Sequence, residues 1–570
     1  MSSIFIQKPI YQFLQPTIEA DWDSLLPYLS NLNDRILDIE PELLKWLKDK
    51  SELEAFLEEN FAWRYIRMTS DTANEEYSKA FRFFAEEIEP KIAPWNDILN
   101  KKLMGSSALS SIEKEPYLPF LKKIKSQIEL YREENIPLFT ELQIKQQEYA
   151  KISGAMSVKI QGKVYTMEQA ATFLKDQNRD VRKEAFEKIA ERRLKDVDAI
   201  QALLEDLIEL RQKVARNAGF DNFRDYSYKA LGRFDYGPKE ANQFQEAIRL
   251  EIVPLLKVQA ENRRKALGLE DLKPWDMDVD ISLKPALKPF QNGEELIDKS
   301  IACFQKIDPF FGECLSSMKK EGFFDVESRA GKAPGGYNYP LAESGAPFIF
   351  MNSANSFRDL TTMVHEGGHA VHTFLSRNLP LNDFKHLTSE IAELASMSME
   401  LISMKYWDIF FPNPEDLKRA KKDQLIDSLK TFPWVAIIDK FQDRMYTEKY
   451  SPESLIRIWN QIYQEFGGGF CDWTGFEDYR DHIWQKQLHI FEVPFYYIEY
   501  GIAGLGAIAV WKNFVQDPAK AIQSYKNALS LGYTLSIPET YQRAGIRFDM
   551  SQAYIAELAG FVQSELEAKA

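Results

Sequence analysis

The sequence predicts a mainly α-helical protein with a few short strands. Charged and apolar residues alternate at spacings of three and four along most of the chain, as in residues 43–61 and 202–219, which is typical of helices with one apolar face. Few segments show the two-residue alternation or the short apolar run of a strand. With 570 residues, the chain can form several lobes or one large helical body around an internal space.

The expected strands lie in two regions. Residues 157–167, SVKIQGKVYTM, alternate about a Gln161-Gly162 turn and predict a hairpin. Residues 346–352, APFIFMN, form a short apolar run that predicts a further strand. We expect the hairpin to separate an N-terminal helical lobe, residues 1–150, from the rest of the chain, residues 151–570.

Composition indicates which kinds of partner the protein can bind and in which cellular compartment we expect it. The net charge of -15 argues against nucleic acid, because phosphate binding needs a basic surface. The three cysteines, Cys303, Cys314 and Cys471, form no CxxC pair and are odd in number, which disfavours disulfides and a cysteine zinc cage. The N-terminus lacks a basic stretch before a long apolar core, and the apolar run 501–511 is too short to span a bilayer. We therefore expect a cytoplasmic protein with no membrane partner; the oligomeric state stays open.

The stretch VHEGGHAVH, residues 364–372, contains three of the six histidines. On a helix, His365 and His369 lie one turn apart on the same face, so both imidazoles can reach one metal ion about 2 Å away. Glu366 is rotated by about 100° from that face, which suits a group that handles water bound to the metal. The stretch therefore matches the HExxH pattern of a zinc site.

The surroundings of this motif also predict a helix. Ser356 with Asp359 three residues later resembles a capping box. Gly367 and Gly368 would allow another backbone or a substrate to approach closely. His372 lies a further turn along the same face, where packing or support of the ligands is favoured over metal binding.

Zinc in a catalytic site needs a third protein ligand, which leaves the fourth position for water. The HExxHxxGxxH class would have glycine at 372 and histidine at 375, whereas this chain has His372 and Leu375. That class is therefore excluded. The remaining option is a carboxylate from a second helix.

Residues 388–401 offer such a carboxylate. Glu390, Glu393 and Glu400 share one helical face, and Glu393 is flanked by four apolar residues, which is typical of a buried and partnered acid. We assign Glu393 as the third ligand of one Zn²⁺ ion, in a site over residues 365–393. Glu390 and Glu400 are candidates for orienting the histidines.

Five blocks of sequence follow one another in a specific order. They are residues 323–340, 346–352, 361–374, 393–397 and 489–503. In order and spacing they resemble the oligoendopeptidase F branch of the thimet oligopeptidase and oligoendopeptidase F group of zinc metallopeptidases.

The resemblance implies zinc on His365, His369 and Glu393, with Glu366 as the general base, in a gluzincin-type site. It also implies a helical two-lobed body with a deep central channel that holds the zinc at its floor. Such a channel admits short unstructured oligopeptides and excludes folded proteins. Residues 346–352 would be the edge strand on which the peptide backbone pairs.

The resemblance further implies that a histidine and a tyrosine from the late aromatic segment donate hydrogen bonds to the oxyanion of the reaction. This segment offers His489, Tyr496, Tyr497 and Tyr500. We favour His489 and Tyr500, with Tyr497 next.

The sequence thus predicts a zinc-dependent endopeptidase, and two other functions stay open. A zinc aminopeptidase would call for a GxMEN motif, and the nearest stretch, GAMSV at 154–158, lacks its glutamate and asparagine. A helical binding protein with a non-catalytic metal site would usually supply four ligands, often cysteines. None of the three cysteines lies near the histidine motif.

Overall fold

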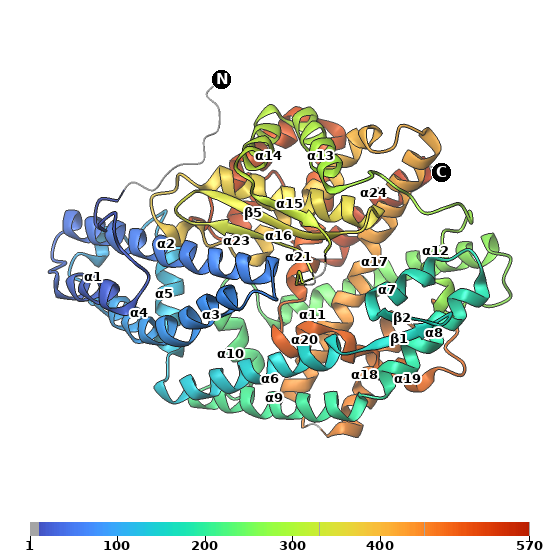
Figure 1. Cartoon of the computed structure of the whole chain (residues 1–570), viewed down its shortest axis with the longest axis horizontal. Helices are drawn as coiled ribbons and strands as arrows, with labels where there is room; N and C mark the ends of the chain where they lie inside the picture. The colour runs from blue at the N-terminus through green and yellow to red at the C-terminus, as the bar shows by residue number, and fades with distance from the viewer. Residues whose placement is uncertain (1–10, 330, 334, 450, 569–570) are drawn as a thin grey trace. The chain divides into compact units, whose positions relative to one another are not determined.

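A computed structural model of the chain describes residues 11–329, 331–333, 335–449 and 451–568. Helices make up most of these residues, and the strands are few and short (Figure 1). The prediction of a mainly α-helical fold is therefore confirmed. None of the described helices is long and apolar enough to cross a membrane.

The chain forms two compact units, each built from three separate segments. The first contains Met1–Glu129, Leu287–Lys422 and Ala503–Phe548, and the second contains Leu130–Ala286, Asp423–Ile502 and Asp549–Ala570. Because each unit is made of separate segments, the two units do not test a single boundary at residue 150. The expected division there stays a prediction.

The first unit combines N-terminal helices with a small sheet and the helix of the histidine motif. Its helices are α1 (Trp22–Asp34), α2 (Glu40–Ser70), α3 (Glu75–Phe83), α4 (Glu89–Met104), α5 (Leu118–Leu130), α13 (Gly293–Ile307), α14 (Pro309–Glu321), α15 (Phe357–Ser376), α16 (Ser389–Ser403), α22 (Pro518–Leu529) and α23 (Ile537–Arg543). Its strands are β3 (Phe324–Glu327), β4 (Tyr337–Leu341) and β5 (Ala346–Ser353). Two long helices, α17 (Pro414–Thr447) and α21 (Ile498–Gln516), carry the chain from one unit into the other.

The sheet of the first unit has the order β3-β5-β4, with β3 parallel and β4 antiparallel to β5. Phe348 and Phe350 of β5 pack with Ala62 and Ile66 of α2, and β5 also contacts α15 (Figure 1). The strand predicted at 346–352 is therefore confirmed, but the expectation that it forms an edge is wrong. Its residues are almost all buried, and such a continuous apolar run is typical of a strand covered on both faces.

The second unit contains the predicted hairpin and the aromatic segment. β1 (Ser157–Ile160) and β2 (Lys163–Thr166) pair antiparallel, and Gln161 and Gly162 between them have φ of 50° and 84°, as a two-residue hairpin turn requires. The hairpin prediction is thus confirmed. The remaining helices are α6 (Ile136–Gly154), α7 (Met167–Thr172), α8 (Arg179–Leu194), α9 (Val197–Asn217), α10 (Phe223–Ala230), α11 (Pro238–Ala247), α12 (Val253–Ala266), α18 (Pro452–Phe466), α19 (Glu477–His482), α20 (Leu488–Glu492) and α24 (Gln552–Ala568).

Candidate active site

Helix α15 carries the histidine motif and begins at the predicted capping box. Ser356 Oγ accepts from the backbone N–H of Asp359 (3.3 Å), and Asp359 Oδ2 accepts from the backbone N–H of Ser356 (2.8 Å). The two bonds satisfy N–H groups that a helix start leaves without partners. The capping box thus fixes where α15 begins, with its N-cap Ser356 nine residues before His365.

The structure brings His365 and His369 of α15 together with Glu393 of α16. One donor atom from each lies within 4.8 Å of the others. Glu393 Oε2 is 3.4 Å from His365 Nε2 and 3.9 Å from His369 Nε2. Ligands that each bind zinc at about 2.0–2.2 Å in a tetrahedral arrangement lie roughly 3.3 Å apart. The spacing of the three side chains therefore fits one zinc ion.

Neighbouring groups orient each of the three side chains. His365 Nδ1 lies 2.7 Å from Glu400 Oε1, which leaves Nε2 on the side of Glu393. His369 hydrogen-bonds the Ala392 backbone. The Glu393 carboxylate accepts from Ser396 Oγ (3.1 Å). Carboxylates and carbonyls commonly hold metal-binding histidines in this way.

The electrostatics of this group favour a cation. Burial lowers the pKa of His365, but the hydrogen bond that His365 Nδ1 donates to Glu400 and the charge of Glu393 outweigh it and raise that pKa to about 10. Burial and the charges of Glu393 and Glu400 raise the pKa of Glu366 to about 7, against the opposing effect of His365. The negative field that attracts a proton to His365 would also attract a metal ion, which displaces that proton on binding.

The two glycines of the motif face atoms of other elements. A Cβ at Gly367 would lie 2.5 Å from the ring of Phe304 on α13. A Cβ at Gly368 would lie 2.7 Å from Ser396 Cα and 2.8 Å from the carbonyl oxygen of Ala395. The close approach predicted at this pair is therefore made by a phenylalanine ring and by the backbone of α16. Glycine at 368 lets α16 come near enough to bring Glu393 to the histidines.

We expect Gly368→Ala to destabilise the protein by about 1–3 kcal/mol, because its methyl group would force α16 away from α15. Zinc content should fall as well, since Glu393 moves with α16. Gly560→Ala is the matched control, because a Cβ there has no atom within 4 Å and alanine favours an exposed helix position by about 0.5–1 kcal/mol. Thermal unfolding and metal analysis of both variants measure the effects; equal melting temperatures and zinc contents would contradict this account.

His372 and Glu390 take no part in the group of three. His372 is 1% exposed, and burial lowers its pKa to about 3, which agrees with a packing role. Glu390 is 2% exposed. Of the two acids considered for orienting the histidines, the structure brings Glu400 into contact with His365.

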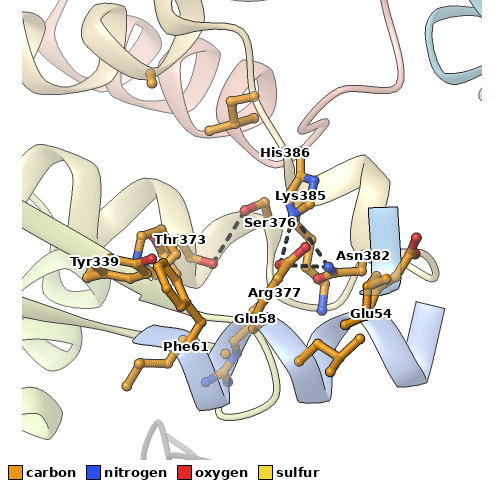
Figure 2. Close-up of a pocket in the computed structure, with 18 of the residues that line it drawn as sticks. Glu54, Glu58, Phe61, Tyr339, Thr373, Ser376, Arg377, Asn382, Lys385 and His386 are labelled. Carbon is orange, nitrogen blue, oxygen red and sulfur yellow. Dashed lines mark hydrogen bonds and ion pairs between the residues drawn. The ribbon is translucent and has the colours of Figure 1, made fainter. Parts of the chain in front are cut away.

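A cavity of about 830 Å³ lies between residues of α2, β4, α15 and α16 (Figure 2). Its lining includes Phe61 of α2, Tyr339 of β4, Thr373 of α15 and Ala392 of α16. Thr373 Oγ1 donates to the carbonyl oxygen of His369 (3.2 Å), and Ala392 hydrogen-bonds the same histidine. The cavity therefore adjoins the turns of α15 and α16 that follow His369 and precede Glu393, although its lining residues include none of the three side chains.

Polar side chains at the same cavity are bonded to one another. Glu58 Oε2 accepts from Asn382 Nδ2 (2.8 Å) and lies 2.9 Å from His386 Nε2, as Figure 2 shows. Glu54 pairs with Lys50. Because these carboxylates are already paired, a bound ligand would contact mainly the apolar side chains that line the cavity.

The aromatic segment belongs to the second unit, where it forms a cluster of its own. The ring of His489 lies 4.8 Å from that of Tyr497, 5.9 Å from that of Tyr500 and 6.0 Å from that of Tyr496. The structure thus brings the predicted histidine and tyrosines together. Burial lowers the pKa of His489 to about 4 and raises that of Tyr497 to about 12.

Two arginines that sequence reasoning missed bind the backbone of this segment. Arg211 donates to the carbonyl of Ile490 (2.9 Å), and Arg233 donates to the carbonyl of Phe495 and to Glu499 Oε1 (2.9 Å). Phe495 has a φ of 67°, which is strained for a non-glycine residue. Both arginines are distant in sequence, and no local motif marks them.

The comparisons with known proteins agree with the resemblance found in the sequence. The model of Peptidase family M3 matches residues 172–560, and that of the Peptidase M3 N-terminal domain matches residues 15–131. The solved structure of PZ peptidase A with an inhibitor has the same fold, with a TM-score of 0.89 over 98% of each chain at 24% identity.

Two curated relatives are both oligoendopeptidase F homologues. The one from Borreliella burgdorferi is 22% identical over 369 residues, which cover 63% of this chain and 60% of that protein. The one from Lactococcus lactis subsp. lactis is 23% identical over 403 residues, which cover 70% of this chain and 65% of that protein. The matches therefore span less than two thirds of the length of these relatives. The resemblance to oligoendopeptidase F is confirmed, and the chain belongs to peptidase family M3.

Proposed function

We propose that this chain is a zinc-dependent endopeptidase that hydrolyses short, unstructured oligopeptides. The observation that carries the proposal is the meeting of His365, His369 and Glu393 within 4.8 Å, next to the buried carboxyl of Glu366. Two imidazoles, one carboxylate and an adjacent glutamate are the components of a hydrolytic zinc site. Membership of a peptidase family supports peptides as the substrate class.

The donor set suits zinc, which binds imidazole nitrogen and carboxylate oxygen in sites of three protein ligands. In our proposal His365, His369 and Glu393 hold the ion, and Glu400 keeps Nδ1 of His365 engaged so that Nε2 is the ligand atom. A zinc ion held there would polarise the scissile carbonyl and make a water molecule acidic at neutral pH.

Glu366 acts as the general base in this proposal. Its carboxylate takes a proton from the attacking water and passes it to the amine that leaves. A general base must lie beside the water that it deprotonates, and the place of the buried Glu366 next to His365 on α15 supports this role. Asn338 Nδ2 donates to the backbone carbonyl of Glu366 (3.1 Å), which links β4 to α15 at this residue.

The tetrahedral oxyanion formed in this reaction needs hydrogen-bond donors. We propose His489 and Tyr500 for this role, with Tyr497 next. Their support is the ring cluster around His489 and the raised pKa of Tyr497, which keeps its hydroxyl protonated and able to donate. Because β5 is paired on both sides, the peptide backbone would pair with the outer edge of β4 instead.

The cavity beside His369 would take an apolar side chain of the substrate. Its volume of about 830 Å³ lies within the range of about 300–1,000 Å³ usual for ligand sites. Because Thr373 and Ala392 belong to its wall and contact His369, a peptide held at the metal would place a nearby residue in it.

Internally quenched peptides of increasing length, together with a folded protein, test the proposal. We expect rapid cleavage of the short peptides, loss of cleavage with a chelator, and recovery with one equivalent of zinc. Peptides with a large apolar residue beside the cleaved bond should be cut at least about tenfold faster than glycine counterparts, because burying such a side chain is worth about 1.5–3 kcal/mol.

Each part of the proposal has its own contrary result. Cleavage that persists without metal would refute the zinc role, and digestion of the folded protein would refute the substrate class. Release of single N-terminal residues would identify an aminopeptidase instead. Equal rates with glycine and large apolar residues would refute the role of the cavity.

A further inference from the structure

Two side chains outside the proposed catalytic set form a hydrogen-bonded chain to His489. Trp434 of α17 donates from Nε1 to Gln487 Oε1 (2.8 Å). The amide nitrogen of Gln487, Nε2, lies 2.7 Å from His489 Nδ1. Trp434, Gln487 and His489 are all partly buried, and hydrogen bonds are stronger at the lower dielectric of a protein interior than in water.

The chemistry of the three groups fixes the direction of each bond. An indole N–H can only donate, so the Gln487 atom that faces Trp434 must be the amide oxygen. The amide nitrogen then faces His489, and an amide NH₂ can only donate. Nδ1 of His489 is therefore the acceptor. Trp434 thus removes the ambiguity that usually attends the orientation of a glutamine amide.

The protonation of His489 follows from that direction. Burial lowers its pKa to about 4, so the ring is neutral near pH 7 and carries one proton. A neutral imidazole has one donor and one acceptor nitrogen. Because Nδ1 accepts from Gln487, the proton lies on Nε2, and Nε2 is the nitrogen left to donate.

The tyrosine rings around His489 limit its rotation. The ring of Tyr497 meets it edge-on at 69° and that of Tyr500 at 81°. A ring turned over by 180° about its Cβ bond would lose the contact between Nδ1 and Gln487. The hydrogen bond and the packing therefore favour one orientation together.

We infer that Trp434 and Gln487 are positioning residues that hold His489 as its Nε2–H tautomer, so that Nε2 donates to the developing oxyanion of the substrate. This inference rests on the proposed function, which makes His489 a donor. The inference explains how the chain provides that donor. A relay of two hydrogen bonds, from Trp434 to Gln487 and from Gln487 to His489, selects the tautomer of His489 before substrate binds. A neutral donor also avoids the cost of burying an imidazolium.

Nitrogen-15 NMR of the full-length protein, labelled at histidine, tests the relay without any cleavage. The spectrum of wild type is compared with that of His489→Gln, which identifies the signals of His489. At pH 7 we expect a protonated Nε2 and an unprotonated Nδ1 for this residue. A protonated Nδ1, or protons on both nitrogens, would overturn the inference.

Gln487→Glu tests the same relay through kinetics. A carboxylate can accept from Nδ1–H but cannot donate to Nδ1, so it selects the opposite neutral tautomer and leaves Nε2 without its proton. We expect the NMR pattern to reverse and kcat to fall by about 10²–10³-fold, the usual cost of one oxyanion donor. KM should stay within a few-fold, because the lost hydrogen bond belongs to the transition state.

Two further variants complete the test. Gln143→Glu adds the same charge at an exposed position of α6 and should leave both kcat and the His489 signals unchanged. Gln487→Met removes the hydrogen bond without adding charge, and should give a mixture of the two tautomers. If wild type cleaves no peptide, the proposed function fails while the NMR result still decides the relay. If wild type cleaves and Gln487→Glu keeps its kcat, the relay fails and the proposed function stands.

Discussion

Glu366→Gln should lower kcat for an internally quenched peptide by about 10²–10⁴-fold, the usual contribution of a general base. Glutamine has nearly the same shape as glutamate but accepts no proton at neutral pH. We expect the substitution to affect catalysis but not zinc binding, because Glu366 is not one of the three side chains that meet at the candidate metal position. Zinc content should therefore stay at the wild-type value.

Single-turnover cleavage and metal analysis of the same preparation measure these two effects. Glu75→Gln is a suitable control, because Glu75 lies exposed on α3 and its neutralisation should change neither quantity. Undiminished cleavage by Glu366→Gln would remove Glu366 from the mechanism. Loss of zinc together with activity would instead make Glu366 a ligand.

Glu393→Gln should weaken zinc binding by more than about 100-fold and abolish cleavage at stoichiometric zinc. A neutral amide replaces a carboxylate whose Oε2 lies 3.4 Å from His365 Nε2 and 3.9 Å from His369 Nε2. Removing a group that only supports a ligand already costs about 10–100-fold in metal affinity, and loss of a ligand should cost more. Competition with a chromophoric chelator measures the affinity.

Glu400→Gln is the informative companion to this variant. Its side chain would still meet His365 Nδ1 but without charge, so zinc affinity should fall by about 10–100-fold while saturating zinc restores cleavage. If Glu393→Gln keeps its zinc and Glu390→Gln loses it, the third ligand is Glu390. If Glu400→Gln binds zinc as wild type does, the contact between Glu400 and His365 has no role in metal binding.

The local parts of the site could be predicted because a single helix generates them. The spacing of His365, Glu366 and His369 places two imidazoles on one face and the carboxyl beside them for any regular helix. Ser356 and Asp359 form the expected capping box because only four consecutive residues take part. The Gln161-Gly162 hairpin is local in the same sense.

Strand order required the tertiary structure. The run at 346–352 identifies a strand, but which strands pair beside it depends on two separate segments that both precede it in sequence, β3 and β4. The edge assignment failed for that reason. Any residue except proline can form the backbone hydrogen bonds of a strand, so the amino-acid sequence does not show which strands pair. Burial of both faces, in contrast, is visible in the sequence as the continuous apolar run.

The helical class, the HExxH spacing on α15 and the family of the chain could be read from the amino-acid sequence, because each depends on residues close together or on ordered blocks. The folded structure was needed to show that α16 packs against Gly368 closely enough to bring Glu393 to the histidines. Likewise, Trp434 is 53 residues from Gln487, and only folding joins them. Helical periodicity sets the direction of a side chain from its own helix, whereas contact between helices depends on the shape of both surfaces.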